Sequence, residues 1–408
     1  MTTDAPRPET LLITLTGRDR PGVTGAIFAH LAEAGVEVVD LEQIVLRRRL
    51  VLGVLVTVPA DGAAEVALRD AVTRTGTDLG MHVEIVRGSG DNAAKVHRAH
   101  VTVIGAPLQA SGMAAVTGRI AEAGANIDRI QRLARYPVTA IELAVSGADP
   151  DQLRMLLAHE AAEQGIDIAV QATNLLRHGM RLIVMDVDST LIQGEVIEML
   201  AAHAGCEAEV AEVTERAMRG EIDFEESLRS RVKLLAGVPA SALDEVYAAI
   251  QLNPGARTMV RTLRRLGYRF AIVSGGFSQI TSRLAADLGI HYARANELEI
   301  VDGELTGGIL GPVVDRAGKA QALREFAAEL GISEAATIAI GDGANDLDML
   351  AAAGLGIAYN AKPVVRSQAD TAVNVPYLDT IMYLLGITRE EIEAADAEAG
   401  IVTPAPPV

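Results

Sequence analysis

The stretch VMDVDSTLIQG, residues 184–194, places two aspartates directly after an apolar run. Residues 182–185 are typical of a short buried strand, and Asp186 and Asp188 follow it two positions apart. Carboxylates are costly to bury unless they are paired or hold a cation. The stretch therefore predicts a strand whose carboxyl end carries a functional site.

Two later strands also end in polar residues. YRFAIVSGG at 268–276 ends near Ser274, and TIAIGDGAND at 337–346 contains Asp342. From residue 181 onward, strands alternate with long helical stretches, which indicates a parallel α/β sheet. Ligands of such sheets bind outside the carboxyl ends of the strands. We therefore expect one site to gather Asp186, Asp188, Ser274, Asp342, Asn345 and Asp346.

Gathered carboxylates repel one another unless a cation lies among them. An all-oxygen set favours Mg²⁺ over the cysteine and histidine ligands of structural zinc. Ser274, the backbone at Gly275 and Lys319 in DRAGKAQALREF add donors for a phosphate. A single DxD after a strand is more often a turn or a helix cap, but the full set predicts phosphoryl transfer to an aspartate. GPVVDRAGKA is not a Walker A loop, because its spacing is wrong and Ala320 replaces the Ser or Thr.

The ordered motifs DVDST, SGG, lysine and GDGAND closely resemble the haloacid dehalogenase superfamily, and within it the phosphoserine phosphatases, over residues 180–388. The resemblance implies that Asp186 is the nucleophile and Asp188 the general acid and base. It also implies that Mg²⁺ is held by Asp186, the backbone carbonyl of Asp188 and Asp342, with Asp346 acting through water.

A long segment between the first two strands carries four amphipathic helical stretches. It predicts a helical cap over the site, at about 194–253, because a strand-to-helix connection needs far fewer residues. The resemblance implies that the substrate is bound by Glu195 through its ammonium group and by Arg231 through its carboxylate, with Met218 and Phe224 as apolar walls. Each of these four alone is more often an ordinary helix residue. Pro254 is expected at the first position of the next helix.

The first half contains a weak duplication, since HLAEAGVEVVDLEQI at 30–44 reappears as RIAEAGANIDRIQRL at 119–133. Each copy predicts the ferredoxin-like order βαββαβ. With GRDRPGV at 17–23 the first copy resembles an ACT domain, which implies an amino-acid effector near Gly17, Asp19 and Gly22. The second copy has GAPLQASGM instead, so its ligand site is not implied. Two packing modules without a ligand are the alternative.

The expected fold class is α/β, with a Rossmann-like parallel-sheet hydrolase core and a helical cap, preceded by two ferredoxin-like domains. The tail is expected to be an acidic helix followed by a frayed, proline-rich end. The expected domains are residues 1–95, 96–178, 179–388 and a tail at 389–408.

Net charge and composition argue against several classes of binding partner. A formal net charge of −18 argues against nucleic-acid binding, and no apolar run is long enough for a membrane span. The polar start is unlike a signal peptide, and the single cysteine, Cys206, permits no internal disulfide, so a cytoplasmic protein is expected. Uncovered sheet faces and edges over residues 1–178 predict a homodimer or a larger homo-oligomer.

The resemblance implies Mg²⁺-dependent hydrolysis of L-phosphoserine to L-serine and phosphate through an aspartyl-phosphate, as the last step of serine biosynthesis. L-serine is then both product and candidate effector. Two alternatives stay open: a phosphatase for another small phosphomonoester or a phosphoprotein, and an inactive amino-acid-sensing interaction protein.

Overall fold

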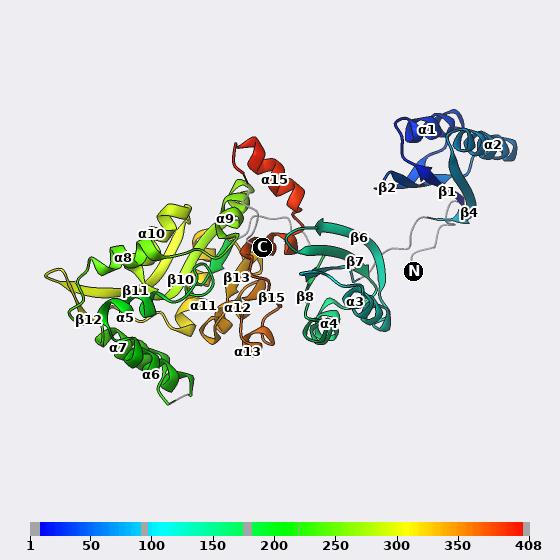
Figure 1. The fold of residues 1–408 in the computed structure, drawn as a ribbon. Helices are drawn as coiled ribbons and strands as arrows, with labels where there is room; N and C mark the ends of the chain where they lie inside the picture. The colour runs from blue at the N-terminus through cyan, green and yellow to red at the C-terminus, as the bar shows by residue number, and fades with distance from the viewer. Residues whose placement is uncertain (1–8, 91–96, 174–181, 220, 403–408) are drawn as a thin grey trace. The chain divides into compact units, whose positions relative to one another are not determined.

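The computed structural model describes residues 9–90, 97–173, 182–219 and 221–402. The chain forms two compact units, residues 1–94 and 95–408. The second unit contains a second ferredoxin-like domain and the α/β domain that was predicted to be catalytic, called the catalytic domain below. Both helices of each ferredoxin-like domain lie on one face of its sheet (Figure 1).

The first unit is a four-stranded antiparallel sheet in the order β2-β3-β1-β4. Alternate residues of its central strand, such as Leu11, Ile13 and Leu15, are fully buried under the helices. The elements are β1 Glu9–Arg18, α1 Val23–Glu33, β2 Val38–Leu46, β3 Arg49–Thr57, α2 Gly62–Asp78 and β4 Met81–Ser89.

The second ferredoxin-like domain repeats this order, as β6-β7-β5-β8. Gly124 and Gly165 follow its two helices with φ of 73° and 62°, a left-handed conformation that favours glycine at helix ends. The elements are β5 Ala99–Gly105, α3 Ala110–Glu122, β6 Asn126–Ala134, β7 Thr139–Ser146, α4 Pro150–Gln164 and β8 Asp167–Ala172.

The catalytic domain has a seven-stranded sheet in the order β12-β11-β10-β9-β13-β14-β15. All neighbouring pairs are parallel except β11 and β12. Met185 at the end of β9 lies opposite Ile272 of β10 and Ile340 of β13, so three carboxyl ends adjoin. The strands are β9 Leu182–Met185, β10 Arg269–Phe277, β11 Tyr292–Val301, β12 Glu304–Leu310, β13 Thr337–Gly341, β14 Leu355–Tyr359 and β15 Thr371–Val373.

Both faces of this sheet are covered, which explains the continuous apolar run at residues 182–185. Ile183 and Met185 belong to one hydrophobic cluster, and Leu182 and Val184 belong to another on the opposite face. The helices include α9 Ala256–Arg265, α10 Ser278–Leu288, α11 Arg316–Glu329, α12 Leu347–Ala352, α13 Pro363–Arg366, α14 Ile381–Leu384 and α15 Arg389–Glu398.

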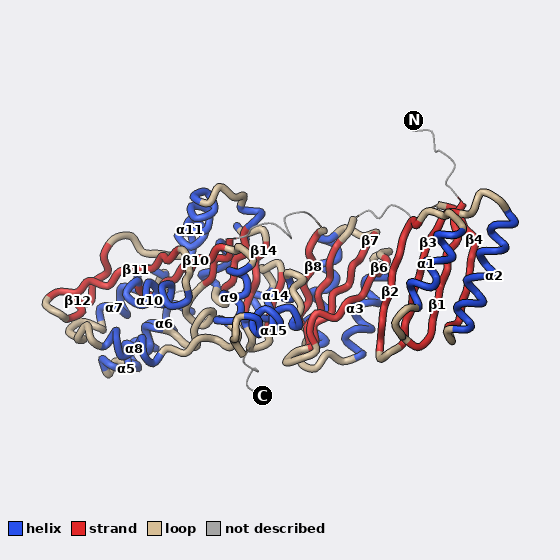
Figure 2. The backbone as a smooth tube through the Cα atoms, turned by 90° about the horizontal axis from the view of Figure 1, so that it is seen from above, coloured by secondary structure: helices blue, strands red, loops and turns tan. Residues whose placement is uncertain are grey.

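Four helices between β9 and β10 form the cap: α5 Val196–Ala204, α6 Glu207–Met218, α7 Phe224–Lys233 and α8 Ala242–Ala249. The hairpin β11–β12 extends beyond the rest of the sheet (Figures 1 and 2) and braces the cap. Backbone hydrogen bonds join Gly237 N to Leu305 O at 2.8 Å and Leu305 N to Val238 O at 2.9 Å. The predicted fold class is confirmed.

The start of α9 differs from the prediction. Gly255 is the N-cap with φ of 83°, so Pro254 lies before the helix and not at its first position. A Cβ atom at Gly255 would lie 2.3 Å from Asp379 Oδ1, so this close approach also requires glycine. The chain therefore turns through a left-handed glycine before the helix begins.

Helix α15 packs against the catalytic domain. Asp396 is fully buried and accepts hydrogen bonds from Arg261 at 2.5 Å and Arg265 at 2.6 Å, both on α9. Ile392 belongs to the main hydrophobic cluster. The predicted acidic helix therefore forms, but it is docked; residues 403–408, predicted to fray, lie outside the described residues.

The second ferredoxin-like domain joins the catalytic domain along β8 and β15. Thr371 Oγ1 donates to Ile168 O at 3.0 Å, and Asn374 donates to both carboxylate oxygens of Asp167 at 2.7 and 2.8 Å. The two domains thus share polar contacts at the edge of the catalytic sheet. Over the described part of the chain, no helix is both long enough and apolar enough to cross a membrane.

Candidate active site

The centre of the site is a buried lysine between two carboxylates. Lys319 is fully buried, and its Nζ lies 2.6 Å from Asp186 Oδ2 and 2.7 Å from Asp346 Oδ1. Burial alone would lower the pKa of Lys319, but the charges and hydrogen bonds of the two carboxylates raise it above its usual value. Lys319 therefore stays protonated and fixes both aspartates.

Asp188 lies in the turn that follows β9. Its Oδ1 accepts from Val196 N at 2.8 Å, and its Oδ2 accepts from Ser274 Oγ at 3.1 Å. Burial raises the pKa of Asp188, while these hydrogen bonds act in the opposite direction. Gly276 N donates to Ser274 Oγ at 2.7 Å, which orients the hydroxyl. Asp188 thus joins the cap to strand β10.

Asparagines hold the loops around these aspartates. Asn253 Nδ2 lies 2.7 Å from Thr190 O and within 3.3 Å of the carbonyls of Ser189 and Ile192. This anchors a turn in which Ser189 has a left-handed φ of 57°. Asn296 bonds Gly275 O and Val314 N, each at 2.8 Å, and so fixes the backbone after β10.

Three carboxylates form a group that fits a divalent cation. Asp186, Asp342 and Asp346 each place an oxygen within 4.8 Å of the others. Burial, and then repulsion from Asp346, raises the pKa of Asp342 to about 6. Burial and Asp346 also raise the pKa of Asp186 well above its usual range. One lysine does not balance three carboxylates, and an all-oxygen group of this kind suits Mg²⁺.

The cap closes a pocket of about 590 Å³ over these residues. A Cβ atom at Gly275 would lie 2.9 Å from Cζ of Phe224, so the first residue of α7 packs directly on the backbone after β10. Ile197, Thr214 and Leu228 add to the cap side of the wall. This volume falls within the range typical of small-molecule sites.

Arg231 and Glu195 face each other across the cap side of the pocket. Arg231 Nη1 lies 4.0 Å from Glu195 Oε2, and Arg231 Nε is buried with no hydrogen-bond partner among the described residues. Burial lowers the pKa of Arg231 and raises that of Glu195. These two charges are thus only partly satisfied by each other, unlike the lysine and aspartates beneath them.

Most predicted site residues come together here. Asp186, Asp188, Asp342 and Asn345 line the pocket, as do Glu195, Phe224, Arg231 and Gly275. Ser274, Lys319 and Asp346 lie fully buried beneath it. The side chain of Met218, at the end of α6, lies outside what the structure describes.

The predicted effector residues lie in the first unit. Gly22 is the N-cap of α1 with φ of 93°, and a Cβ atom at Gly17 would lie 2.4 Å from Met81 Sδ. Asp19 is exposed, and its backbone N–H donates to Arg48 O at 2.7 Å. Their role in binding stays a prediction.

The sequence reasoning missed Lys362, Thr190 and the two anchoring asparagines. Lys362 lines the pocket and is the N-cap of α13, three residues after the end of β14. The rule that polar residues past strand ends form the site would have found it, had it been applied to this fourth strand. Thr190 Oγ1 donates to Asp342 Oδ1 at 2.9 Å. The asparagines carried no comparable signal.

Family comparisons agree with this architecture. The haloacid dehalogenase-like hydrolase family matches residues 183–351, and ACT domain families match residues 9–86 and 97–171. Among solved structures, a haloacid dehalogenase family hydrolase of Salmonella enterica serovar Typhi has a TM-score of 0.62 at 28% identity, covering 70% of this chain and 98% of that one. Fold and site together define a hydrolase of the haloacid dehalogenase type with two ACT domains.

Curated relatives narrow the family. A phosphoserine phosphatase of Streptomyces coelicolor is 60% identical, over 98% of this chain and 96% of its own length. One of Mycobacterium tuberculosis is 52% identical, over 96% and 97%. A probable phosphoserine phosphatase of Vibrio cholerae has a TM-score of 0.56 at 35% identity, covering 75% and 90%. The chain therefore belongs to the phosphoserine phosphatase family.

Proposed function

We propose that the protein hydrolyses L-phosphoserine to L-serine and phosphate, with Mg²⁺ as cofactor, as the last step of serine biosynthesis in the cytoplasm. The observation that carries this proposal is the pocket itself. It presents Asp186 and Asp188 at one end and the incompletely paired Arg231 and Glu195 at the other. A small phosphoester that is also an amino acid has groups for both ends. The single cysteine and the names of the relatives support the compartment and the substrate.

Asp186 is the proposed nucleophile. Its carboxylate oxygen forms a bond to phosphorus while the bond from phosphorus to the serine oxygen breaks. Lys319, 2.6 Å from Asp186 Oδ2, reduces the repulsion between the carboxylate and the incoming phosphate. Mg²⁺, held by Asp186, Asp342, the carbonyl of Asp188 and, through water, Asp346, would supply further charge compensation.

Asp188 is the proposed general acid and base. It gives its proton to the leaving serine oxygen, and the raised pKa that burial causes supports a protonated starting state. A water molecule then attacks phosphorus, its proton passes to Asp188, and the bond from phosphorus to Asp186 breaks. Phosphate leaves with both aspartates restored.

The substrate is held at its amino-acid end by the cap. Arg231, whose buried Nε has no partner in the part of the chain that the structure describes, would pair with the carboxylate of the substrate, and Glu195 would pair with the ammonium group. Phe224 over Gly275 closes the pocket against water at the reacting phosphate. The backbone at Gly275, Asn345 and the hydroxyl of Ser274 would contribute donors near the phosphate.

A panel of phosphate-release assays tests this proposal. The substrates are L-phosphoserine, D-phosphoserine, phosphothreonine and p-nitrophenyl phosphate, each with Mg²⁺ and with EDTA. We expect the highest kcat/KM for L-phosphoserine and no turnover with EDTA. A higher value for another phosphoester would overturn the substrate, and no turnover of any of them would support the inactive sensing protein.

We also propose that L-serine binds the first ACT domain and that the protein is a homodimer or larger homo-oligomer. The exposed Asp19 beside the N-terminus of α1 supports an amino-acid site, and the apolar exposed strand β2, with Ile44 and Leu46, supports assembly. Binding regulates only if serine prefers one of two states. Activity and size of the full chain, measured against serine for wild type and Asp19→Ala, test this; identical serine responses would remove Asp19 from the site.

Helix α13 connects the second ACT domain to the catalytic pocket. Helix α13 lies between them: Val364 and Val365 line the catalytic pocket, while Pro363 and Arg366 line a cleft of about 570 Å³ that borders α4 and β8. A shift of β8 against β15 would therefore move one wall of the pocket.

A further inference from the structure

A second groove, rich in arginine, lies on the catalytic domain. It has a volume of about 490 Å³ between α9, the end of α10 and the start of β10. Five of its ten lining residues are arginines, and one is acidic. Arg269 opens β10 at this groove, whereas Gly275 and Gly276 near the end of β10 line the catalytic pocket. The groove is thus separate from the candidate active site.

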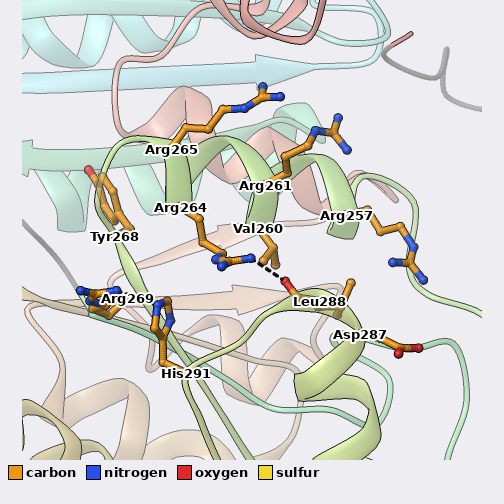
Figure 3. A pocket seen from close by; sticks show the side chains of 10 residues that line it. All are labelled: Arg257, Val260, Arg261, Arg264, Arg265, Tyr268, Arg269, Asp287, Leu288 and His291. Carbon is orange, nitrogen blue, oxygen red and sulfur yellow. Dashed lines mark hydrogen bonds between the residues drawn. The ribbon is translucent and has the colours of Figure 1, made fainter. Parts of the chain in front are cut away.

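Two of the five arginines already share one carboxylate partner. Arg261 and Arg265 bind the buried carboxylate of Asp396 on α15, at 2.5 and 2.6 Å. Figure 3 shows their guanidinium groups turned away from Leu288 and His291. These two therefore stabilise the docking of α15 and leave the groove to the other three.

The remaining arginines are Arg257, Arg264 and Arg269. Among the described residues, no ion pair within 4.0 Å engages any of them. Arg264 Nη1 donates to Leu288 O at 3.2 Å, and it lies so close to Gly289 that a Cβ atom there would be 2.1 Å away. Arg264 is an exposed residue, so a ligand in the groove can reach its guanidinium group.

The acidic residue of the groove is already engaged. The hydroxyl of Tyr247 donates to the carboxylate of Asp287. This neutral donor leaves the negative charge of Asp287 in place, but one carboxylate cannot balance Arg257, Arg264 and Arg269, so the groove keeps a positive surface in a chain whose net charge is −18.

Each of the two ring nitrogens of His291 faces a hydrogen-bond donor. Its Nε2 lies 2.8 Å from Arg269 Nη1, and its Nδ1 lies 3.1 Å from Phe270 N, so a donor faces each ring nitrogen. A neutral imidazole accepts at one nitrogen only. An anion between Arg269 and His291 would accept from both, which removes the conflict.

We propose that this groove binds a phosphorylated small molecule through Arg257, Arg264, Arg269 and His291. Guanidinium groups match phosphate oxygens with two parallel hydrogen bonds, and several of them together give both charge and geometry. The volume is within the range of small-molecule sites, and Val260 supplies an apolar wall for the rest of the ligand. The bound phosphoryl group could belong to free phosphate or to a phosphorylated metabolite.

Histidine NMR signals of the full chain test the proposal at the site itself. The protein is labelled with ¹⁵N-histidine, and the His291 signal is assigned by its loss in His291→Gln. Inorganic phosphate and pyrophosphate are titrated separately at constant ionic strength, so that screening stays fixed. We expect a saturating shift of His291; saturation by phosphate indicates a single phosphoryl group, and saturation by pyrophosphate alone indicates a larger phosphorylated ligand.

The double variant Arg257→Gln/Arg264→Gln keeps the contact between Arg269 and His291 and should weaken binding about tenfold to a hundredfold. Arg324→Gln, which removes an exposed charge on α11 paired with Glu334, is the matched control and should bind like wild type. If the double variant does not fold, Arg257→Gln alone replaces it. A shift that fails to saturate, or equal affinity in wild type and the double variant, overturns the proposal, because ligand bound at the catalytic pocket would give the latter.

Discussion

The core side and the cap side of the catalytic pocket hold their charges differently. On the core side, Lys319 and Asp346 are fully buried and Asp186 is 4% exposed, with contacts of 2.6 and 2.7 Å. On the cap side, Arg231 and Glu195 approach only to 4.0 Å, and the Glu195 side chain is 42% exposed. Charges that satisfy one another suit the step common to every substrate. Charged side chains that lack a full partner can pair with the charges of one particular substrate and so select it.

The largest effect should follow Asp186→Asn. Losing the proposed nucleophile should reduce kcat by about 10⁴-fold or more on every phosphoester alike, because this side of the pocket is not expected to distinguish substrates. Initial rates of phosphate release measure it. Asp348→Asn, which removes an exposed carboxylate of α12, is the control and should keep wild-type rates. Activity of Asp186→Asn near wild type would sink the proposed mechanism.

The next effect should follow Asp188→Asn. Loss of a general acid and base costs about 10²- to 10⁴-fold, so hydrolysis of L-phosphoserine should fall by that factor. With p-nitrophenyl phosphate the leaving group needs no proton, so the first step should survive and the second should slow. Rapid mixing should then show a burst of p-nitrophenolate. The lack of both a burst and a rate loss would mean that Asp188 only holds the cap through Val196.

A smaller and selective effect is expected for Arg231→Ala. Losing a charge-assisted hydrogen bond costs about 1.5–3 kcal/mol, so KM for L-phosphoserine should rise roughly 10- to 150-fold. KM for p-nitrophenyl phosphate, which has no carboxylate to pair, should change little. Arg229→Ala lies on the same helix, is exposed and pairs with Glu225, so it should change neither value. An equal rise in KM for both substrates would mean that Arg231 has a structural role. The cap side of the pocket would then not select the substrate.

The smallest effect is expected where the two sides touch. Gly275→Ala would place Cβ 2.9 Å from Cζ of Phe224 and should cost about 1 kcal/mol, seen as a several-fold higher KM. Adding Phe224→Leu should restore part of the loss by making room. If the double variant is no better than Gly275→Ala, the defect lies in the backbone after β10 and not in cap closure.

The strand-end rule predicted much of the site because the chemistry follows directly from sheet order. Asp186, Ser274 and Asp342 each come just after, or within, the end of a strand whose neighbours are parallel. Lys362 obeys the same rule after β14 and was missed only because that strand was not considered. Asn296 could not be found this way, since it lies within β11 and acts through backbone groups of other segments.

The docking of α15 shows what local sequence cannot supply. The acidic composition of TREEIEAADAEAG predicts a helix, but the burial of Asp396 depends on Arg261 and Arg265, more than a hundred positions earlier. Pro254 gives a similar lesson. Proline favours a helix start, but the tight approach of Gly255 to Asp379 moved that start two residues on.

Through the contact between β8 and β15, the second ACT domain also covers the edge of the catalytic sheet. β15 has three residues and ends the catalytic sheet, and such an edge invites pairing with other chains. Here Thr371 and Asn374 bind Ile168 and Asp167 instead, so the neighbouring domain shields the edge. Removing the first 178 residues would thus expose the edge strand β15 as well as delete the proposed effector site. Aggregation of such a shortened enzyme would then result from exposure of the β15 edge. A change in its kinetics could not be attributed to lost regulation alone.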